Sequence, residues 1–384
     1  MKPRLLILSF VPIDGDPRVM KQVRRFVDEY DVTTCSPGPP PHAGVTHLTM
    51  EGGYVGRRSL PSRLIELVAR PAERFRWLYF RTPVAQQVEE LLGGQEFEAV
   101  IANDADPVGI ACRLFGPHRV HADLHEFFPD MGFAKSRLGR RQQRYYKWMT
   151  RSLISQAASS TTVGAEIARR YREYGLDPQV VTNATHLRDL APSPVGRPIR
   201  LVYSGNPFVV WGLPEIMRAV AAARSDVTLD LFLTRYIPVD RAQVEQLATE
   251  LGDRITVREP VPQSELVETL NAYDVGIFVL PPLSPNSELA LPNKFFDYVQ
   301  ARLALLVGPS VEMARIVRER GLGLVTSDFT DSSIVEAIDA LDADSVQAFK
   351  AASDTAASDL ASERQVEVWA DAVSAIVGGT ADAR

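Results

Sequence analysis

Short apolar runs alternate along the chain with longer segments in which apolar residues recur every three or four positions. Apolar runs bounded by turn residues predict buried strands, and the longer pattern predicts helices. Because strands and helices alternate, the pattern indicates parallel sheets covered on both faces. The predicted fold class is therefore α/β, with doubly wound parallel sheets.

The predicted strands fall into two series on either side of a proline-rich segment. They comprise residues 4–10, 31–36, 97–102, 119–124, 159–163 and 179–182, and then 199–203, 227–233, 254–257, 274–280, 303–307 and 323–325. Prolines forbid regular structure between the two series. We therefore predict a first domain at 1–190, a linker at 191–198 and a second domain at 199–355. A C-terminal helix at 356–384, with its helical pattern over 357–377, is placed to return to the first domain.

Composition agrees with a globular, two-domain protein. The chain has 384 residues, with 45% hydrophobic and 23% charged residues, and its net charge of -6 argues against a general nucleic-acid binder. Two cysteines, Cys35 and Cys112, indicate no disulfide framework and fit a reducing compartment. The apolar run at 5–10 is too short for a signal peptide or a membrane span. We expect a cytoplasmic location.

The segment 287–298 carries the strongest candidate chemistry. It follows the apolar strand predicted at 274–280 and contains Glu288, Lys294 and Asp297. In an open α/β sheet, ligands bind beyond the carboxyl ends of strands, and helix N-termini there attract phosphates. A lysine with flanking carboxylates suits a phosphorylated, hydroxyl-rich ligand such as a nucleotide-sugar. The alternative is a surface helix with charges on its wet face.

Two further candidates follow strands of the first series. Asp16 is a good N-cap for a helix that begins at Pro17, and Gly15 before it would let the backbone approach a phosphate or sugar. His125 follows the strand predicted at 119–124, and imidazole is suited to proton transfer near neutral pH. The alternatives are a well-capped helix and a buried structural histidine.

The run 103–106, Asn-Asp-Ala-Asp, mimics an Asp-x-Asp metal signature. Paired carboxylates of this kind hold a divalent ion against a diphosphate in some transferases. Its place at the end of a predicted strand favours a loop-capping role instead. We therefore predict no metal site.

Three segments resemble the family 4 glycosyltransferases of the GT-B architecture. Residues 16–19 read Asp-Pro-Arg-Val, residues 122–126 resemble the family's YDSHE segment, and residues 291–298 resemble its LPNKLFEY variant. The resemblance covers nearly the whole chain. It implies two Rossmann-like domains facing a central cleft and a retaining, metal-independent transferase. It also implies a UDP- or GDP-linked nucleotide-sugar as co-substrate, with no further cofactor.

The resemblance assigns roles to individual residues. Asn293 and Lys294 would bind the donor diphosphate, and Asp297 would bind the ribose hydroxyls. Glu288 would hold hydroxyls of the transferred sugar, and His125 would contact that sugar. Lys294 would also stabilise the leaving diphosphate, which itself takes the acceptor's proton.

Three positions depart from the family pattern. Gly205 matches the family's glycine after the first strand of the second domain, but Asn206 replaces the usual arginine, and a lysine further on is missing. A diphosphate needs counter-charges, so we propose Lys294 and Arg235 as replacements. Arg302 stands where the family often has glycine, which puts the helix-to-strand packing in doubt.

The sequence therefore predicts a hexosyltransferase-type glycosyltransferase of polysaccharide or glycoconjugate biosynthesis. Its acceptor would be a saccharide, a lipid-linked molecule or a small molecule. Arginines and aromatic residues interleave over 135–151, which indicates either a solvated helix face or peripheral contact with the inner membrane face. A catalytically silent protein that activates a partner glycosyltransferase and a nucleotide-sugar epimerase stay open as alternatives.

Overall fold

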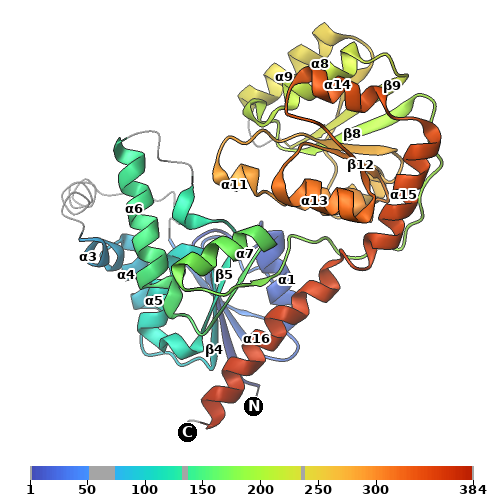
Figure 1. The fold of residues 1–384 in the computed structure, drawn as a ribbon. Helices are drawn as coiled ribbons and strands as arrows, with labels where there is room; N and C mark the ends of the chain where they lie inside the picture. Colours follow the sequence, from blue (N-terminus) through green and yellow to red (C-terminus); the bar gives the residue numbers. More distant parts are fainter. Residues whose placement is uncertain (1, 52–73, 132–136, 235–237, 383–384) are drawn as a thin grey trace. The chain divides into compact units, whose positions relative to one another are not determined.

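The structure, a computed structural model, describes residues 2–51, 74–131, 137–234 and 238–382. The chain forms two compact units (Figure 1). The first unit combines Met1–Thr182 with Gln365–Arg384, and the second unit is Asn183–Arg364. Both are parallel-sheet α/β units, which confirms the predicted fold class.

The segment expected as a linker, 191–198, belongs to the second unit. Ser193 donates its hydroxyl hydrogen to the carbonyl oxygen of Asn271 at 2.7 Å and accepts a hydrogen bond from Lys350 Nζ at 3.0 Å. Arg200 donates to the carbonyl oxygen of Pro194. Prolines exclude a helix or strand here, but these contacts fasten the segment to its own unit.

The first unit is built on a seven-stranded sheet in the order β3-β2-β1-β4-β5-β6-β7, with every neighbouring pair parallel. Its strands are β1 (Arg4–Leu8), β2 (Asp31–Ser36), β3 (Thr46–Thr49), β4 (Ala99–Asn103), β5 (Val120–Leu124), β6 (Ser159–Thr162) and β7 (Gln179–Val180). Only β3 was not predicted. It is a short, mostly polar edge strand without a buried residue.

Helices cover this sheet, and one face has a well-defined core. They are α1 (Pro17–Phe26), α3 (Phe75–Phe80), α4 (Pro83–Leu92), α5 (Ala105–Phe115), α6 (Arg137–Ser152), α7 (Ala165–Tyr171) and α16 (Ser362–Asp382). Leu5 and Ile7 of β1 pack in one cluster with Val23 of α1 and with Trp369 and Val373 of α16. The C-terminal helix, shown in red in Figure 1, is therefore part of the core of the first unit.

The second unit is built on a six-stranded parallel sheet in the order β10-β9-β8-β11-β12-β13. Its strands are β8 (Ile199–Gly205), β9 (Val227–Leu233), β10 (Ile255–Arg258), β11 (Val275–Phe278), β12 (Ala304–Val307) and β13 (Gly323–Val325). Its helices are α8 (Leu213–Ala222), α9 (Pro238–Leu251), α10 (Leu266–Leu270), α11 (Pro285–Glu288), α12 (Asn293–Gln300), α13 (Val311–Arg320), α14 (Asp331–Asp339) and α15 (Ala343–Ala357). Each strand predicted for this series is present, because each is a compact apolar run.

Arg302 makes the turn between α12 and β12 in a left-handed conformation, with φ of 59°. Glycine adopts such a φ without strain, whereas other residues do so at a cost. The buried guanidinium of Arg302 donates to the carbonyl oxygens of Gln300 and Arg188 at 2.7 and 2.8 Å and to Asp354 Oδ1 at 2.6 Å. These hydrogen bonds hold the turn that a glycine would form freely.

Two substitutions at Arg302 separate these effects. Arg302→Ala should lower the free energy of unfolding by about 2–4 kcal/mol, because buried carbonyl oxygens lose charged donors while the left-handed strain stays. Arg302→Gly loses the same donors but relieves about 1 kcal/mol of strain. Urea unfolding followed by circular dichroism should therefore find the glycine variant more stable than the alanine variant. Equal stability would contradict a strained turn.

Candidate functional site

The two sheets each contain a point at which the strand order reverses. It lies between β1 and β4 in the first sheet and between β8 and β11 in the second. Open α/β sheets bind ligands at the carboxyl edge beside such a reversal. Gly15 and Asp104 follow β1 and β4, Gly205 ends β8, and Glu288 ends α11 after β11. These predicted residues therefore come after the strands at which the order reverses.

Lys294 occupies the first turn of α12, in the second unit. Its Nζ is buried 4.0 Å from the ring centroid of Tyr203 and 4.1 Å from that of Phe278. This nitrogen has no hydrogen-bond partner among the residues that the structure describes. Burial lowers the pKa of Lys294 to about 7, against the opposing charge of Asp297. A buried amine that can change its charge near neutral pH, held beside aromatic rings, is typical of a functional site.

The loop after β8 passes directly over this amine. Gly205 has φ of 132°, and a Cβ added there would lie 2.9 Å from Lys294 Nζ. A larger residue would therefore displace the lysine. Asn206, next in the chain, accepts a hydrogen bond on Oδ1 from Thr234 Oγ1 at 2.5 Å. The structure thus brings Lys294 and Gly205 together, with Asn206 fixed beside them by its own neighbour.

Three other predicted residues lie near Lys294 in the sequence, and their side chains differ in solvent exposure. Asp297 is buried, and its Oδ1 accepts a hydrogen bond from Thr185 Oγ1 at 2.6 Å. Asn293 is exposed at the start of α12, where Pro292 supplies no side-chain cap. Glu288 is exposed at the end of α11 rather than buried with Lys294. Arg235 lies outside the described residues.

Sequence reasoning missed two serines at this edge. Ser204 near the end of β8 and Ser310 at the start of α13 each bury a hydroxyl oxygen that has no partner in the described part of the chain. Buried polar atoms are nearly always hydrogen-bonded, so such atoms call for an explanation. Serine is common in loops, and nothing in its sequence context distinguished these two.

In the first unit, Asp16 caps α1 as predicted. Its carboxylate accepts hydrogen bonds from the amides of Arg18 and Val19 at 2.9 and 3.2 Å, and Pro17 follows in the first helical position. A Cβ added to Gly15 would meet no described atom within 4 Å, so the space beside this backbone is open.

Behind this loop lies a buried polar network around Asp123 of β5. Arg18 donates to both oxygens of this carboxylate at 2.6 and 2.8 Å, and Gln22 and Thr161 add hydrogen bonds at 2.7 and 2.6 Å. The Arg18 guanidinium also lies 4.9 Å from the ring centroid of Trp369. Burial alone would raise the pKa of Asp123, but the charge of Arg18 and its neighbours holds that pKa well below its usual range.

His125 lies just beyond β5 between two carboxylates. Its Nε2 is 3.3 Å from Asp123 Oδ2, and its Nδ1 is 3.5 Å from Asp104 Oδ1. Burial alone would lower the pKa of His125, but the two carboxylates outweigh it and raise the pKa to about 9. The imidazole is thus held as a cation at neutral pH, and 17% of its side-chain surface is exposed.

A loop-capping role was expected for residues 103–106. The Asp104 carboxylate accepts a hydrogen bond from the amide of His125 in the loop after β5, but it does not cap α5. This residue occupies the N-cap position of α5, but its carboxylate accepts no hydrogen bond from the amides of that helix, all of which are described. Its φ of 70° directs the carboxylate towards His125 instead. Across the described ranges, no group of three or more potential metal ligands is present.

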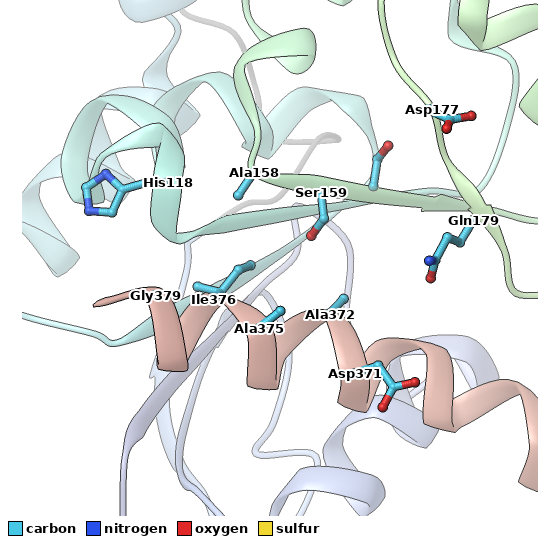
Figure 2. Close-up of a pocket in the computed structure, with 11 residues that line it drawn as sticks. His118, Ala158, Ser159, Asp177, Gln179, Asp371, Ala372, Ala375, Ile376 and Gly379 are labelled. Carbon is cyan, nitrogen blue, oxygen red and sulfur yellow. The ribbon is translucent and has the colours of Figure 1, made fainter. Parts of the chain in front are cut away.

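A hollow of about 650 Å³ opens on another part of the first unit (Figure 2). It lies between α16 and the starts of β6 and β7, and Ser159, Gln179 and Asp371 are among its lining residues. These strand starts are at the amino edge of the sheet, opposite to His125. The described residues that line the hollow include none of the predicted site residues, so it is separate from the candidate site.

Solved structures with the same fold are glycosyltransferases of the GT-B architecture. Sucrose-phosphate synthase from Thermosynechococcus elongatus is 12% identical, over 97% of this chain and 100% of that chain, with a TM-score of 0.69. Anabaena HepE, solved with UDP and glucose, is 11% identical over 97% and 100%, with a TM-score of 0.68. A UDP-forming trehalose-phosphate synthase from Burkholderia vietnamiensis is 14% identical over 97% and 100%, with a TM-score of 0.66. The chain therefore has the GT-B fold.

No protein-family model and no curated protein matches the chain. Membership of family 4 therefore stays a prediction. Within the described residues, no helix is both long enough and apolar enough to span a membrane.

The burial of Lys294 has a consequence for stability that can be measured. Between pH 7 and 9.5 the native amine is deprotonated, whereas a lysine in the unfolded chain keeps its proton, so stability must rise with pH. Across this window the free energy of unfolding of the wild type should rise by about 3 kcal/mol more than that of Lys294→Met. The free energy of unfolding is measured by urea unfolding at several pH values. The same pH dependence in the wild type and Lys294→Met would contradict a buried, largely neutral lysine.

Proposed function

We propose that the protein is a retaining glycosyltransferase that moves a sugar from a nucleotide-sugar to a hydroxyl-bearing acceptor. The GT-B fold supports this class. UDP is the first choice for the nucleotide, because one protein of the same fold was solved with UDP and glucose and another is named as UDP-forming. The donor is a co-substrate, and the proposal includes no metal and no other cofactor.

The observation that carries the proposal is the buried amine of Lys294. It has no partner among the described residues, it adjoins the loop at Gly205, and it lies at the carboxyl edge where phosphate ligands bind. A diphosphate arriving beside it would raise its pKa and fix the positive charge. Binding of the donor thus adds a counter-ion to the charge of Asp297, which no described residue supplies through a hydrogen bond to Lys294.

Other residues of the second unit complete the donor site in this proposal. Asn293 and the amides at the start of α12 contact the diphosphate, and Arg235 adds a second positive charge. Asp297 faces the ribose hydroxyls, and exposed Glu288 holds hydroxyls of the transferred sugar. Bond cleavage leaves negative charge on the departing diphosphate, and Lys294 stabilises that charge while the phosphate takes the acceptor's proton.

The first unit holds the acceptor in this proposal. Open space beside Gly15 admits a ligand close to the backbone, and the His125 imidazolium contacts the reacting sugar. The acceptor is a saccharide, a lipid-linked molecule or a small molecule.

A thermal-shift panel of UDP, GDP, ADP, TDP and CMP tests the donor assignment. A nucleotide that binds only the native protein stabilises it by about 2.7 kcal/mol at a hundred times its Kd. We expect UDP to raise Tm with and without EDTA. Stabilisation by another nucleotide would reassign the base, and loss of the effect with EDTA would overturn metal independence. If no nucleotide stabilises the protein, the silent activator of a partner glycosyltransferase becomes the better account.

Turnover of the stabilising nucleotide's sugar derivatives tests the role of Lys294. Lys294→Ala should lower kcat by about a hundredfold and donor affinity by less, because charge on the leaving diphosphate is largest in the transition state. The exposed residue Arg318 on α13 offers a control, and Arg318→Ala should leave both unchanged. An unchanged kcat in Lys294→Ala would contradict the proposed role. Formation of an epimerised nucleotide-sugar would instead indicate an epimerase.

A cationic aromatic surface on the first unit supports peripheral contact with anionic lipid. Exposed Arg74, Arg76 and Arg81 surround Trp77, whose exposed fraction is 44%, at a hollow of about 530 Å³ beside Trp148 of α6. Arginines bind anionic headgroups, and tryptophan favours the membrane interface. We propose that α3 and α6 rest on such a surface when the acceptor is lipid-linked.

Vesicle co-sedimentation tests this contact. Replacing Arg74, Arg76 and Arg81 with glutamine should weaken binding to phosphatidylglycerol-containing vesicles by about a hundredfold, since each charge near the surface contributes about 1 kcal/mol. The same change at Arg224, Arg258 and Arg320, exposed in the second unit, serves as the matched control. Equal binding of both triple variants would contradict the proposed surface.

A further inference from the structure

Asp104 has a backbone conformation that is close to exclusive to glycine. Its φ is 70° and its ψ is 175°. A non-glycine residue in this region costs about 1–3 kcal/mol and persists only where the surroundings enforce it. Since the carboxylate does not cap α5, helix capping does not account for the strain. The conformation therefore needs another reason.

The strained conformation places the carboxylate against His125. Asp104 Oδ1 is buried 3.5 Å from His125 Nδ1, and Asp123 Oδ2 lies 3.3 Å from His125 Nε2, so both contacts are ion pairs without hydrogen-bond geometry. The Asp104 amide donates to the carbonyl oxygen of Asp123 at 2.7 Å, which ties the loop after β4 to the end of β5. Both ring nitrogens of His125 thus face carboxylates that are fixed to neighbouring strands.

The charges around the imidazole come from three elements. Asp104 follows β4, Asp123 belongs to β5, and Arg18 and Asp16 belong to α1 and its cap. Arg18 is committed to Asp123 through two hydrogen bonds. Burial raises the pKa of Asp104, and the positive charge of His125 and a hydrogen bond from the His125 amide oppose that shift. The carboxylate of Asp104 and the imidazole therefore depend on each other for their charge states.

We propose that Asp104 is a positioning residue whose strained backbone, together with Asp123, clamps the His125 imidazole between two carboxylates as a cation. Neither ring nitrogen is then free to take a proton, so His125 is not a general base. It presents a fixed positive charge to the oxygen atoms of a sugar, which fits a retaining reaction in which the diphosphate takes the acceptor's proton. That last role rests on the proposed function, whereas the clamp itself does not.

Nuclear magnetic resonance of protein labelled with 15N-histidine tests the clamp without requiring turnover. In the wild type, both ring nitrogens of His125 should give imidazolium shifts at pH 7.5, with a titration midpoint near 9. In Asp104→Asn, which keeps the size of the side chain, the midpoint should fall by about 1–3 units. Asp177→Asn, at an exposed carboxylate of the same unit, is the control and should leave the midpoint unchanged.

The strain is tested with a second variant. Asp104→Gly also removes the charge but suits the backbone, so its Tm should exceed that of Asp104→Asn by about 2–4 °C. A neutral His125 ring in the wild type at pH 7.5, an unchanged midpoint in Asp104→Asn, or a glycine variant no more stable than the asparagine variant would each overturn the proposal. If these experiments show His125 to be a cation that depends on Asp104 but no nucleotide binds, the proposed function is contradicted and the proposed role of Asp104 is supported.

Discussion

The ion pair between Arg18 and Asp123 is the constraint on which the first unit depends. Asp123 is fully buried, and its partner is 5% exposed. A buried carboxylate without a partner is severely destabilising, so β5 can carry Asp123 only if α1 delivers Arg18 to it. The cap at Asp16 and the fixed start at Pro17 set where α1 begins, and hence where Arg18 lies. The same carboxylate then reaches His125, so a structural ion pair also sets the charge at the edge of the sheet.

The two units treat their buried charges in opposite ways. In the first, Arg18, Asp123, Gln22 and Thr161 satisfy one another, and the network is closed. In the second, the buried amine of Lys294 finds only aromatic faces among the described residues. A network whose polar groups are all hydrogen-bonded fixes the positions of its side chains. A buried amine without a hydrogen-bond partner instead favours the binding of an anion. This difference agrees with the proposal that the first unit positions the reacting groups and the second binds the anionic donor.

Most of the fold followed from the sequence because parallel strands buried on both faces are written as compact apolar runs. The strand that was not predicted, β3, is a polar edge strand without a buried residue. The cap at Asp16 was equally predictable, because capping depends on local sequence alone. The unit to which residues 191–198 belong could not be predicted in this way. The contacts of Ser193 with Asn271 and Lys350 join residues that are far apart in the chain.

The sequence singled out residues that the structure places at the carboxyl edges of the two sheets, but it did not predict their burial and charge states. Lys294 was singled out by its place at a helix start beyond a strand, but its burial under Tyr203 and Phe278 depends on two other strands. Asp104 was assigned to loop capping from its place at the end of a predicted strand, and that place says nothing of a strained φ. Charge states of this kind arise from residues that are far apart in the chain, so single-sequence reasoning cannot reach them.

The contribution of α16 to the core of the first unit has a consequence for biosynthesis. Trp369 and Val373 pack on strands whose residues are translated near the start of the chain, and the whole second unit lies between them in the sequence. During synthesis on the ribosome, the second unit can therefore fold as soon as it emerges, whereas the first must wait with an open apolar face. The first unit therefore completes its core only after the second unit has been synthesised, when α16 is made.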